Sequence, residues 1–297
     1  MMEQIPASWP AGLLRFVEQS WGDVRAVEPL SGLSGAKVWR LATDRQWAVV
    51  KQCSPSEARF YEAVAPRLRA AGVGVPELWW SGARARKRWV LIEYLPAAPL
   101  RSAWVGNPAW MRALARLHQL PLDVFAPLKA PYRPAWSEAM VEAALELVPQ
   151  RRRQALRAHL GAVAAAVERL QGYVRPISGD PNPLNWGLRA DGSAVLFDWE
   201  RAGFGPPAFD LAITIPGLAS DSAAQQVARA YLSAAAEVPP APQAVAALAR
   251  DIARCKVWVV VEFMAEAVER GMELGPAYGE LWRAVPDWVA RIARLTG

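Results

Sequence analysis

The sequence of 297 residues predicts an α+β protein with a strand-rich part over residues 1–96 and a mostly helical part over residues 97–297. Three observations support this prediction. Compact runs of β-branched and aromatic residues occur before residue 96, and apolar residues at helical spacing dominate after residue 100. The proline-rich segment 95–99 between them indicates a stiff connector, so we place the domain boundary there.

The first part is expected to contain five strands and one helix. Ser54, Pro55 and Glu57 form a capping box, with a hydroxyl at the N-cap, proline at the first helical position and an acid two residues later. This box predicts a helix that ends near residue 71. The expected strands cover residues 24–30, 37–42, 47–51, 77–80 and 88–94.

The second part is expected to be helical except for one irregular block over residues 175–210, with a short hairpin at Asp191 and Gly192. Functional side chains often lie on such irregular segments, held by a rigid scaffold. We therefore expect the functional side chains to lie in this block. The expected helices cover residues 107–119, 135–147, 150–171, 222–236, 241–271 and 277–294.

Composition excludes several classes of protein. The two cysteines, Cys53 and Cys255, fit no metal or redox spacing, and we expect both to be buried apolar side chains. No apolar run approaches the length of a membrane span, and the N-terminus lacks the pattern of a signal peptide. We expect a cytoplasmic protein that binds no membrane.

The formal net charge of +6 leaves a nucleic-acid binder as one alternative. The basic residues are scattered, however, whereas nucleic-acid binders more often show a basic run or stripe. We therefore expect no nucleic-acid partner.

Three polar residues of the irregular block, Asp180, Asn185 and Asp198, have the side chains that phosphoryl transfer requires. That reaction needs a carboxylate to orient the acceptor hydroxyl and take its proton, together with oxygen ligands that hold Mg²⁺ against the phosphates. Asp180 suits the first role, and Asn185 and Asp198 suit the second.

The same segment resembles the aminoglycoside phosphotransferase and choline kinase family. The pattern G-D-x-x-x-x-N begins at Gly179, D-W-E begins at Asp198, and D-L-A begins at Asp210, in the order and spacing of that family. The resemblance implies a protein-kinase-like two-lobed fold, with a small antiparallel-sheet N-lobe for the nucleotide. A large, mostly helical C-lobe would carry the catalytic loop, the metal site and the acceptor pocket. The implied cofactors are ATP and Mg²⁺, and nothing in the sequence excludes GTP.

By this resemblance Asp180 is the catalytic base, Asn185 and Asp198 hold Mg²⁺, and Asp210 supports the catalytic loop by accepting backbone N–H bonds. One position departs from the family pattern. The family usually has histidine before Gly-Asp, and this chain has Ser178. We expect Ser178 to support the loop, with a hydroxyl that can hydrogen-bond within it.

Lys51, at the end of the strand 47–51, is expected to bind the α- and β-phosphates of the nucleotide and to pair with an acid. Glu57 is the first choice for that acid because Glu57-Ala-Arg-Phe-Tyr61 resembles the family's E-x-x-F-Y helix start. Glu62, on the next turn, is the second choice.

Two further segments are candidates for nucleotide binding. Ser34 and Gly35 lie in a turn between the first two strands, where glycine lets backbone N–H groups approach phosphate; a plain hairpin turn is equally consistent. Glu93 and Leu95 occupy the family's hinge position, where backbone groups would bind the base.

Two signals in the second part concern structure and the acceptor. His118 closes an L-A-x-L-H pattern similar to the family's helix signature, and we interpret it as structural. Trp258 and Glu262 begin a stripe that continues through Glu266 and Glu269 on one helical face. Such a face suits an amine or quaternary ammonium acceptor. The alternative is a solvated face with local ion pairs such as Glu266–Arg270.

The sequence therefore predicts an ATP-dependent phosphotransferase, a small-molecule O-kinase that phosphorylates a hydroxyl of a metabolite such as an amino alcohol or an aminoglycoside. The alternative is a catalytically silent kinase fold that serves as a nucleotide-binding or scaffold protein. The acceptor and the oligomeric state stay open.

Overall fold

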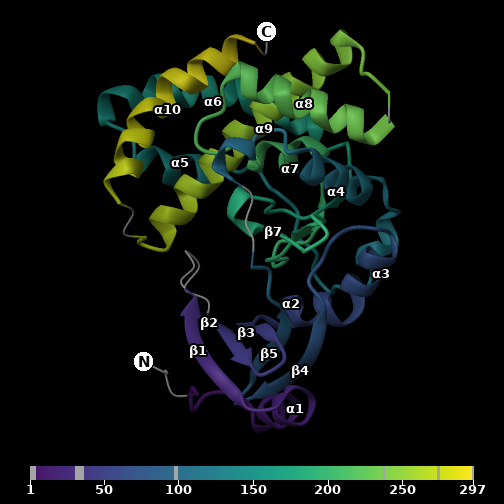
Figure 1. The fold of residues 1–297 in the computed structure, drawn as a ribbon. Coiled ribbons are helices and arrows are strands. Elements are labelled where there is room, and N and C mark those ends of the chain that lie inside the picture. Colours follow the sequence, from purple (N-terminus) through teal and green to yellow (C-terminus); the bar gives the residue numbers. More distant parts are fainter. Residues whose placement is uncertain (1–4, 31–36, 97–99, 237, 273–274, 296–297) are drawn as a thin grey trace. The chain divides into compact units, whose positions relative to one another are not determined.

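The computed structural model describes residues 5–30, 37–96, 100–236, 238–272 and 275–295 (Figure 1). The chain divides into two compact units. The first, called the sheet unit, comprises Met1–Ala98, Leu122–Pro131 and Trp186–Ala202; the second, called the helical unit, comprises Pro99–Pro121, Tyr132–Asn185 and Gly203–Gly297. The single boundary predicted at residue 96 is therefore incomplete, because two later segments fold with the N-terminal sheet.

The sheet unit is built on five antiparallel strands in the order β1-β2-β3-β5-β4. All five predicted strands are present, with ends shifted by a few residues. In the central strand β3, Lys51 lies between Val38 of β2 and Val90 of β5. The strands are β1 (Val24–Leu30), β2 (Val38–Thr43), β3 (Trp47–Cys53), β4 (Leu78–Arg84) and β5 (Lys87–Glu93).

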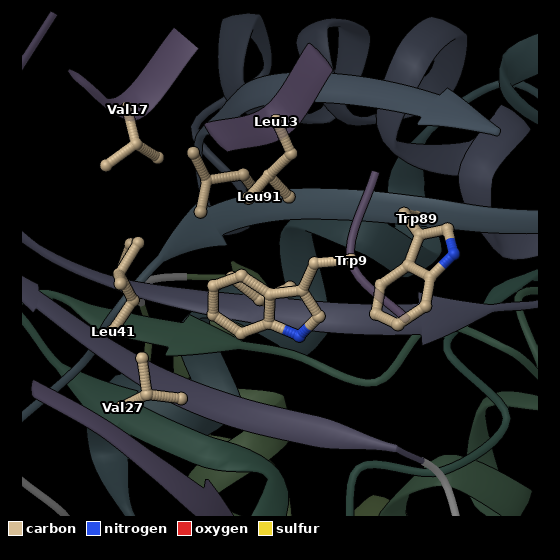
Figure 2. Close-up of a cluster of buried hydrophobic side chains, with 9 residues drawn as sticks. Trp9, Leu13, Val17, Val27, Leu41, Trp89 and Leu91 are labelled. Carbon is tan, nitrogen blue, oxygen red and sulfur yellow. The ribbon is translucent and has the colours of Figure 1, made fainter. Parts of the chain in front are cut away.

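A helix that the sequence analysis missed, α1 (Ala11–Trp21), covers one face of this sheet. Leu13 and Val17 of α1, together with Trp9, pack into a buried cluster with side chains of the strands (Figure 2). Val50 belongs to this cluster. Successive side chains of a strand point to opposite faces, so Lys51 points away from the α1 face.

The predicted capping box is confirmed in part: the Ser54 hydroxyl oxygen accepts the Glu57 N–H at 3.1 Å. The helix that follows is not uniform. It runs as α2 (Pro55–Arg59), a π-helical turn (Phe60–Val64) and α3 (Ala65–Ala70). A π-turn inserted in an α-helix is frequent at functional sites, and this one directly follows the helix that carries Glu57.

The predicted hairpin at Asp191 and Gly192 is confirmed as β7 (Trp186–Leu188) and β8 (Ala194–Leu196), and it belongs to the sheet unit. The Leu196 N–H donates to the Gly74 carbonyl at 3.0 Å. A Cβ on Gly74 would lie 2.1 Å from the Ala194 carbonyl oxygen, so only glycine permits this approach. The contact fixes the end of β8, which precedes Asp198, against the segment before β4.

Among its described residues, the helical unit contains all six predicted helices and an α-helix that was not predicted, α7 (Pro207–Ile213), which is too short for a periodic signal. α9 is central and packs against α5, α7 and α8 (Figure 1). The six predicted helices are α4 (Pro108–Gln119), α5 (Glu138–Glu146), α6 (Gln150–Leu170), α8 (Asp221–Ala236), α9 (Pro242–Glu269) and α10 (Pro276–Arg294). None of the helices in the described residues is long and apolar enough to cross a membrane.

A short ribbon, β6 (Arg175–Ile177) paired with β9 (Gly203–Gly205), leads into the segment that carries Asp180. Tyr132 forms a parallel bridge with Gly203 on the other side of β9. A Cβ on Gly203 would lie 1.9 Å from the Tyr132 carbonyl oxygen, so the bridge requires glycine there. The ribbon thus gives the segment after Ile177 a fixed starting point.

Candidate active site

The segment of residues 178–185, which we call the catalytic loop, is held by a buried carboxylate. Asp210 of α7 is fully buried and accepts the backbone N–H groups of Ser178 at 2.8 Å and Gly179 at 2.9 Å. Gly179 has a φ of 77°, a conformation that favours glycine, immediately before Asp180. The predicted bonding of Asp210 to the loop backbone is confirmed.

Asp210 has a further partner in His118, which lies on α4 and is also buried. The Nε2 atom of His118 is 3.2 Å from Asp210 Oδ2, and its Nδ1 atom is 3.0 Å from the Tyr231 hydroxyl. A carboxylate accepts hydrogen bonds, so Nε2–H of His118 points at Asp210, and Nδ1 shares a hydrogen bond with the Tyr231 hydroxyl. His118 is therefore structural, as predicted, and Tyr231 of α8 is a supporting residue that no sequence motif indicated.

Ser178 supports the loop through its backbone rather than its side chain. Its hydroxyl oxygen is buried and has no hydrogen-bond partner among the described residues. The expected hydroxyl bond within the loop is therefore not formed, because the Asp210 carboxylate is occupied by backbone N–H groups and His118.

The carboxylate of Asp180 is partly exposed and receives two side-chain amides. Asn182 Nδ2 donates to Oδ1 at 3.0 Å, and Asn185 Nδ2 donates to Oδ2 at 3.0 Å. Asn185 Nδ2 also donates to the backbone carbonyl of Asp180 at 2.9 Å. Since these bonds use the nitrogen of Asn185, its carbonyl oxygen is the atom suited to bind a cation.

In the sheet unit, Lys51 joins two carboxylates. Its Nζ atom lies 2.7 Å from Glu57 Oε1 and 2.9 Å from Asp198 Oδ1. Burial alone would lower the pKa of Lys51, but the two carboxylates outweigh burial and raise the pKa above its usual value. Lys51 is therefore a fixed positive charge.

The structure decides between the two candidate partners of Lys51. Glu62 accepts from the Ser81 hydroxyl at 2.6 Å and forms an ion pair with Arg88. Glu57 is thus the acid that pairs with Lys51.

Asp198 is held in an unusual backbone conformation. Its φ of 63° lies in the left-handed region, which aspartate tolerates better than most residues and which is often found at functional sites. The next residue, Trp199, stacks on Phe60 with ring centroids 4.8 Å apart and donates from Nε1 to the Leu196 carbonyl at 2.7 Å. Trp199 thereby anchors the turn that presents Asp198 to Lys51.

Glu200, the last residue of the D-W-E pattern, is a candidate metal ligand that was not predicted from the sequence. One ligand oxygen each of Glu57, Asp198 and Glu200 lie within 4.8 Å of one another. Glu57 Oε2 is buried without a hydrogen-bond partner among the described residues. Burial raises the pKa of the Glu57 carboxyl to about 8. The carboxylate oxygens of Asp198 and Glu200 fit Mg²⁺, which prefers hard oxygen ligands.

The predicted hinge residues have defined side-chain contacts. The carboxylate of Glu93 binds Arg189 at 2.8 and 2.7 Å, and Leu95 packs on Gly187, where a Cβ would lie 2.5 Å from Leu95 Cβ. Binding of a nucleotide base by their backbone groups stays a prediction. Ser34 and Gly35 lie outside the described residues.

The residues of the predicted acceptor stripe on α9 lie in different environments. Trp258 has no exposed surface and packs on Phe209 at 5.3 Å, so its prediction as a residue of an open pocket is wrong. The reason is that α9 is surrounded by other helices, so its faces are mostly buried. Glu262 is half-buried and accepts the Tyr132 hydroxyl at 2.8 Å. Glu266 pairs with Arg270 at 2.8 Å, which is the local ion pair of the alternative interpretation.

Comparison with known proteins decides the family. The sequence model described as the phosphotransferase enzyme family matches residues 26–248, well over half of the chain. The chain belongs to the phosphotransferase enzyme family. The match includes Lys51, Asp180, Asn185, Asp198 and Asp210. No curated protein matches the chain.

Solved structures show that the phosphotransferase fold extends over almost the whole chain. An ethanolamine kinase of Plasmodium vivax matches with a TM-score of 0.63 at 13% identity, covering 96% of this chain and 89% of that one. A spectinomycin phosphotransferase in complex with ADP and spectinomycin matches with a TM-score of 0.63 at 12% identity, covering 98% and 99%. A macrolide 2′-phosphotransferase of Brachybacterium faecium matches with a TM-score of 0.59 at 18% identity, covering 94% and 98%. The predicted α+β, kinase-like phosphotransferase fold is confirmed.

Proposed function

We propose that this phosphotransferase is an ATP-dependent O-kinase that phosphorylates a hydroxyl of a small metabolite. The observation that carries the proposal is the buried Lys51, bonded to both Glu57 and Asp198. A fixed ammonium beside an acidic cluster suits the phosphates of a nucleotide with its Mg²⁺ ion. A protein that used the fold only as a scaffold would not need this arrangement.

In the proposed reaction, the acceptor hydroxyl oxygen attacks the γ-phosphorus of ATP, the bond to the β-phosphate oxygen breaks, and ADP leaves. Asp180 orients the hydroxyl and takes its proton. Asp198, Glu200 and the carbonyl oxygen of Asn185 would hold Mg²⁺, which when bound neutralises phosphate charge. Lys51 binds the α- and β-phosphates.

The acceptor is proposed to be a cationic amine with a hydroxyl. Glu262 supports this because it is half-buried and its position is fixed by the Tyr132 hydroxyl. Tyr132 bridges to Gly203, which pairs with Ile177 at the start of the catalytic loop. The carboxylate is therefore tied, through one ribbon, to the segment that carries Asp180. A carboxylate beside a bound cation gains Coulomb energy as water is excluded.

The first test measures transfer of labelled γ-phosphate from ATP to ethanolamine, choline, spectinomycin and a macrolide, with ethylene glycol as an uncharged counterpart of ethanolamine. We expect turnover with at least one cationic acceptor. The Asp180→Asn variant should lose about 10²- to 10⁴-fold in kcat, the usual contribution of a general base, and retain nucleotide binding. A variant that kept a tenth of wild-type kcat would exclude Asp180 as the base.

The second test concerns the amine. The Glu262→Gln variant keeps an acceptor for the Tyr132 hydroxyl but removes the charge, so KM for a cationic acceptor should rise about tenfold while KM for ATP stays unchanged. The Glu266→Gln variant, on the same helix but paired with Arg270, is the matched control and should behave as wild type. Equal KM values in all three proteins would exclude the amine acceptor at this site.

The alternative of a silent kinase fold rests on Ser178, where the family usually has histidine. It predicts nucleotide binding without phosphate transfer to any acceptor and without Mg²⁺-dependent hydrolysis of ATP. The same assay separates the two proposals.

A further inference from the structure

We propose that Asn182 is a positioning residue that holds the carboxylate of Asp180 in its reactive orientation; this inference rests on the proposed function. The side-chain nitrogen of Asn182 donates to Asp180 Oδ1 at 3.0 Å, while Asn185 donates to Oδ2 at 3.0 Å. Each carboxylate oxygen is thus bonded by a different asparagine. Asn185 already has an assigned role, and Asn182 has none.

The two amides act on the torsion that a carboxylate leaves free. Rotation of an aspartate carboxylate about its last bond is broad and only weakly restricted. One amide bonded to one oxygen limits this rotation little, but amides bonded to both oxygens define the carboxylate plane. A general base must lie within hydrogen-bond distance of the proton that it takes, so this orientation matters for the reaction.

The catalytic loop keeps Asn182 itself in place. Its side-chain oxygen accepts the Leu184 N–H at 2.9 Å, and its backbone carbonyl accepts the Asn185 N–H at 2.9 Å. The neighbouring residues Pro181 and Pro183 are buried, and each has a fixed φ. Asn182 is therefore pre-oriented toward Asp180.

These contacts also raise a simpler possibility, that Asn182 serves only to form the turn. The chain itself shows how to separate the two roles. In the β7–β8 hairpin, the carboxylate of Asp191 accepts the Ser193 N–H at 2.8 Å, two residues on, in the same type of turn. Aspartate can thus make the same type of turn in this chain. An Asn182→Asp variant should keep the turn, lose the donor to Asp180 and add a like charge beside it.

The experiment compares wild type, Asn182→Asp and Asn182→Ala, with Asp191→Asn as a control that keeps an Asx turn outside the catalytic loop. Steady-state kcat and KM for MgATP are measured with the best acceptor and also for hydrolysis of MgATP in water. Thermal unfolding of each protein reports on the fold. The two assays together do not depend on knowing the physiological acceptor.

The positioning role predicts that the two Asn182 variants rank in opposite order by kcat and by unfolding temperature. Asn182→Ala should lower kcat about tenfold, and Asn182→Asp about 100-fold, because the introduced carboxylate repels Asp180 and displaces it. KM for MgATP should stay unchanged in both. Unfolding temperature should be higher for Asn182→Asp than for Asn182→Ala, since only the first keeps the turn.

A purely structural role predicts the reverse for activity: Asn182→Asp near wild type and Asn182→Ala impaired. That result would overturn the positioning role and leave the proposed function intact. A wild-type protein without transfer or hydrolysis would overturn the proposed function, and the positioning role with it. A change in Asp191→Asn equal to that in Asn182→Asp would also overturn the positioning role, because Asp191 lies outside the catalytic loop.

Discussion

Lys51 and Asp198 are 147 positions apart in the chain, and their side chains form an ion pair of 2.9 Å. The pair belongs to one compact unit, because the hairpin before Asp198 folds with the N-terminal sheet. Glu57 completes the group from the other side of Lys51.

The first prediction concerns the charge of Lys51. Replacing it with methionine leaves Glu57 buried without its cation, which should cost stability as well as function. Breaking a buried pair by removing one partner typically costs about 3–5 kcal/mol. We expect Lys51→Met to lower the free energy of unfolding by an amount in this range and to weaken ATP binding, measured by urea denaturation and calorimetry. In the double variant Lys51→Met/Glu57→Gln most of the stability should return while ATP binding stays weak. Equal ATP affinity in wild type and Lys51→Met would exclude the phosphate-binding role.

The second prediction concerns the metal. Asp198 and Glu200 contribute oxygens to the acidic cluster. If they hold Mg²⁺, the metal should tighten ATP binding in wild type and have much less effect in Asp198→Asn and in Glu200→Gln. Calorimetric titration of ATP with and without Mg²⁺ measures the difference. As the control, Glu62→Gln changes a carboxylate on the next turn of the helix, which pairs with Arg88 instead, and should respond to Mg²⁺ as wild type does.

The third prediction uses Lys256, whose ammonium is buried in α9 and donates to the Ile215 carbonyl. Burial lowers the pKa of Lys256 from 10.5 to about 8. Between these values the unfolded chain binds more protons than the folded one, so this group makes stability rise with pH in that window. The full effect is about 3 kcal/mol.

The Lys256→Met variant lacks this titration. The difference in free energy of unfolding, Lys256→Met minus wild type, should be largest near pH 7. It should fall by about 3 kcal/mol as the pH rises to 10.5, because only the wild type gains stability over this range. Urea denaturation at several pH values measures the difference, in which titrations common to both proteins cancel. A difference that does not vary with pH would show that Lys256 titrates at its ordinary value.

The fourth prediction concerns the ribbon that leads to the catalytic loop. A Cβ on Gly203 would lie 1.9 Å from a backbone oxygen of Tyr132, so the backbone must move. Gly203→Ala should lower the free energy of unfolding by more than about 3 kcal/mol and reduce kcat. Gly161→Ala, within α6, meets no atom within 4 Å and should raise stability by up to about 1 kcal/mol. Similar effects of the two substitutions would contradict the role of Gly203.

Residue patterns predicted much of the fold because most elements here have a local signal. The strands around Lys51 have β-branched runs, the capping box at Ser54 marks a helix start, and Asp191-Gly192 marks a turn. α1 was missed although Leu13 and Val17 recur at helical spacing, and only tertiary packing shows that this helix covers the sheet.

The spacing of Asp180, Asn185 and Asp210 along the chain predicted that they lie together, and the structure brings them together around one loop. Contacts between distant segments have no such signal. Tyr231 binds His118 from another helix, and Trp258 is buried because α9 is surrounded. The pairing of Lys51 with Glu57 rather than Glu62 depends on the direction of each side chain, which the sequence alone leaves open.

The discontinuous sheet unit has a consequence for synthesis on the ribosome. The segment Trp186–Ala202, which anchors to Gly74 and carries Asp198 toward Lys51, is made only after the whole of α4, α5 and α6. Domains usually fold as units during translation, starting from the N-terminus. Here the strand that carries Lys51 is synthesised more than a hundred codons before Asp198, so the sheet unit cannot be completed until that later segment has been made. The nascent chain must keep this sheet in an incomplete state, with Lys51 lacking one of its two carboxylate partners, until Asp198 has been synthesised.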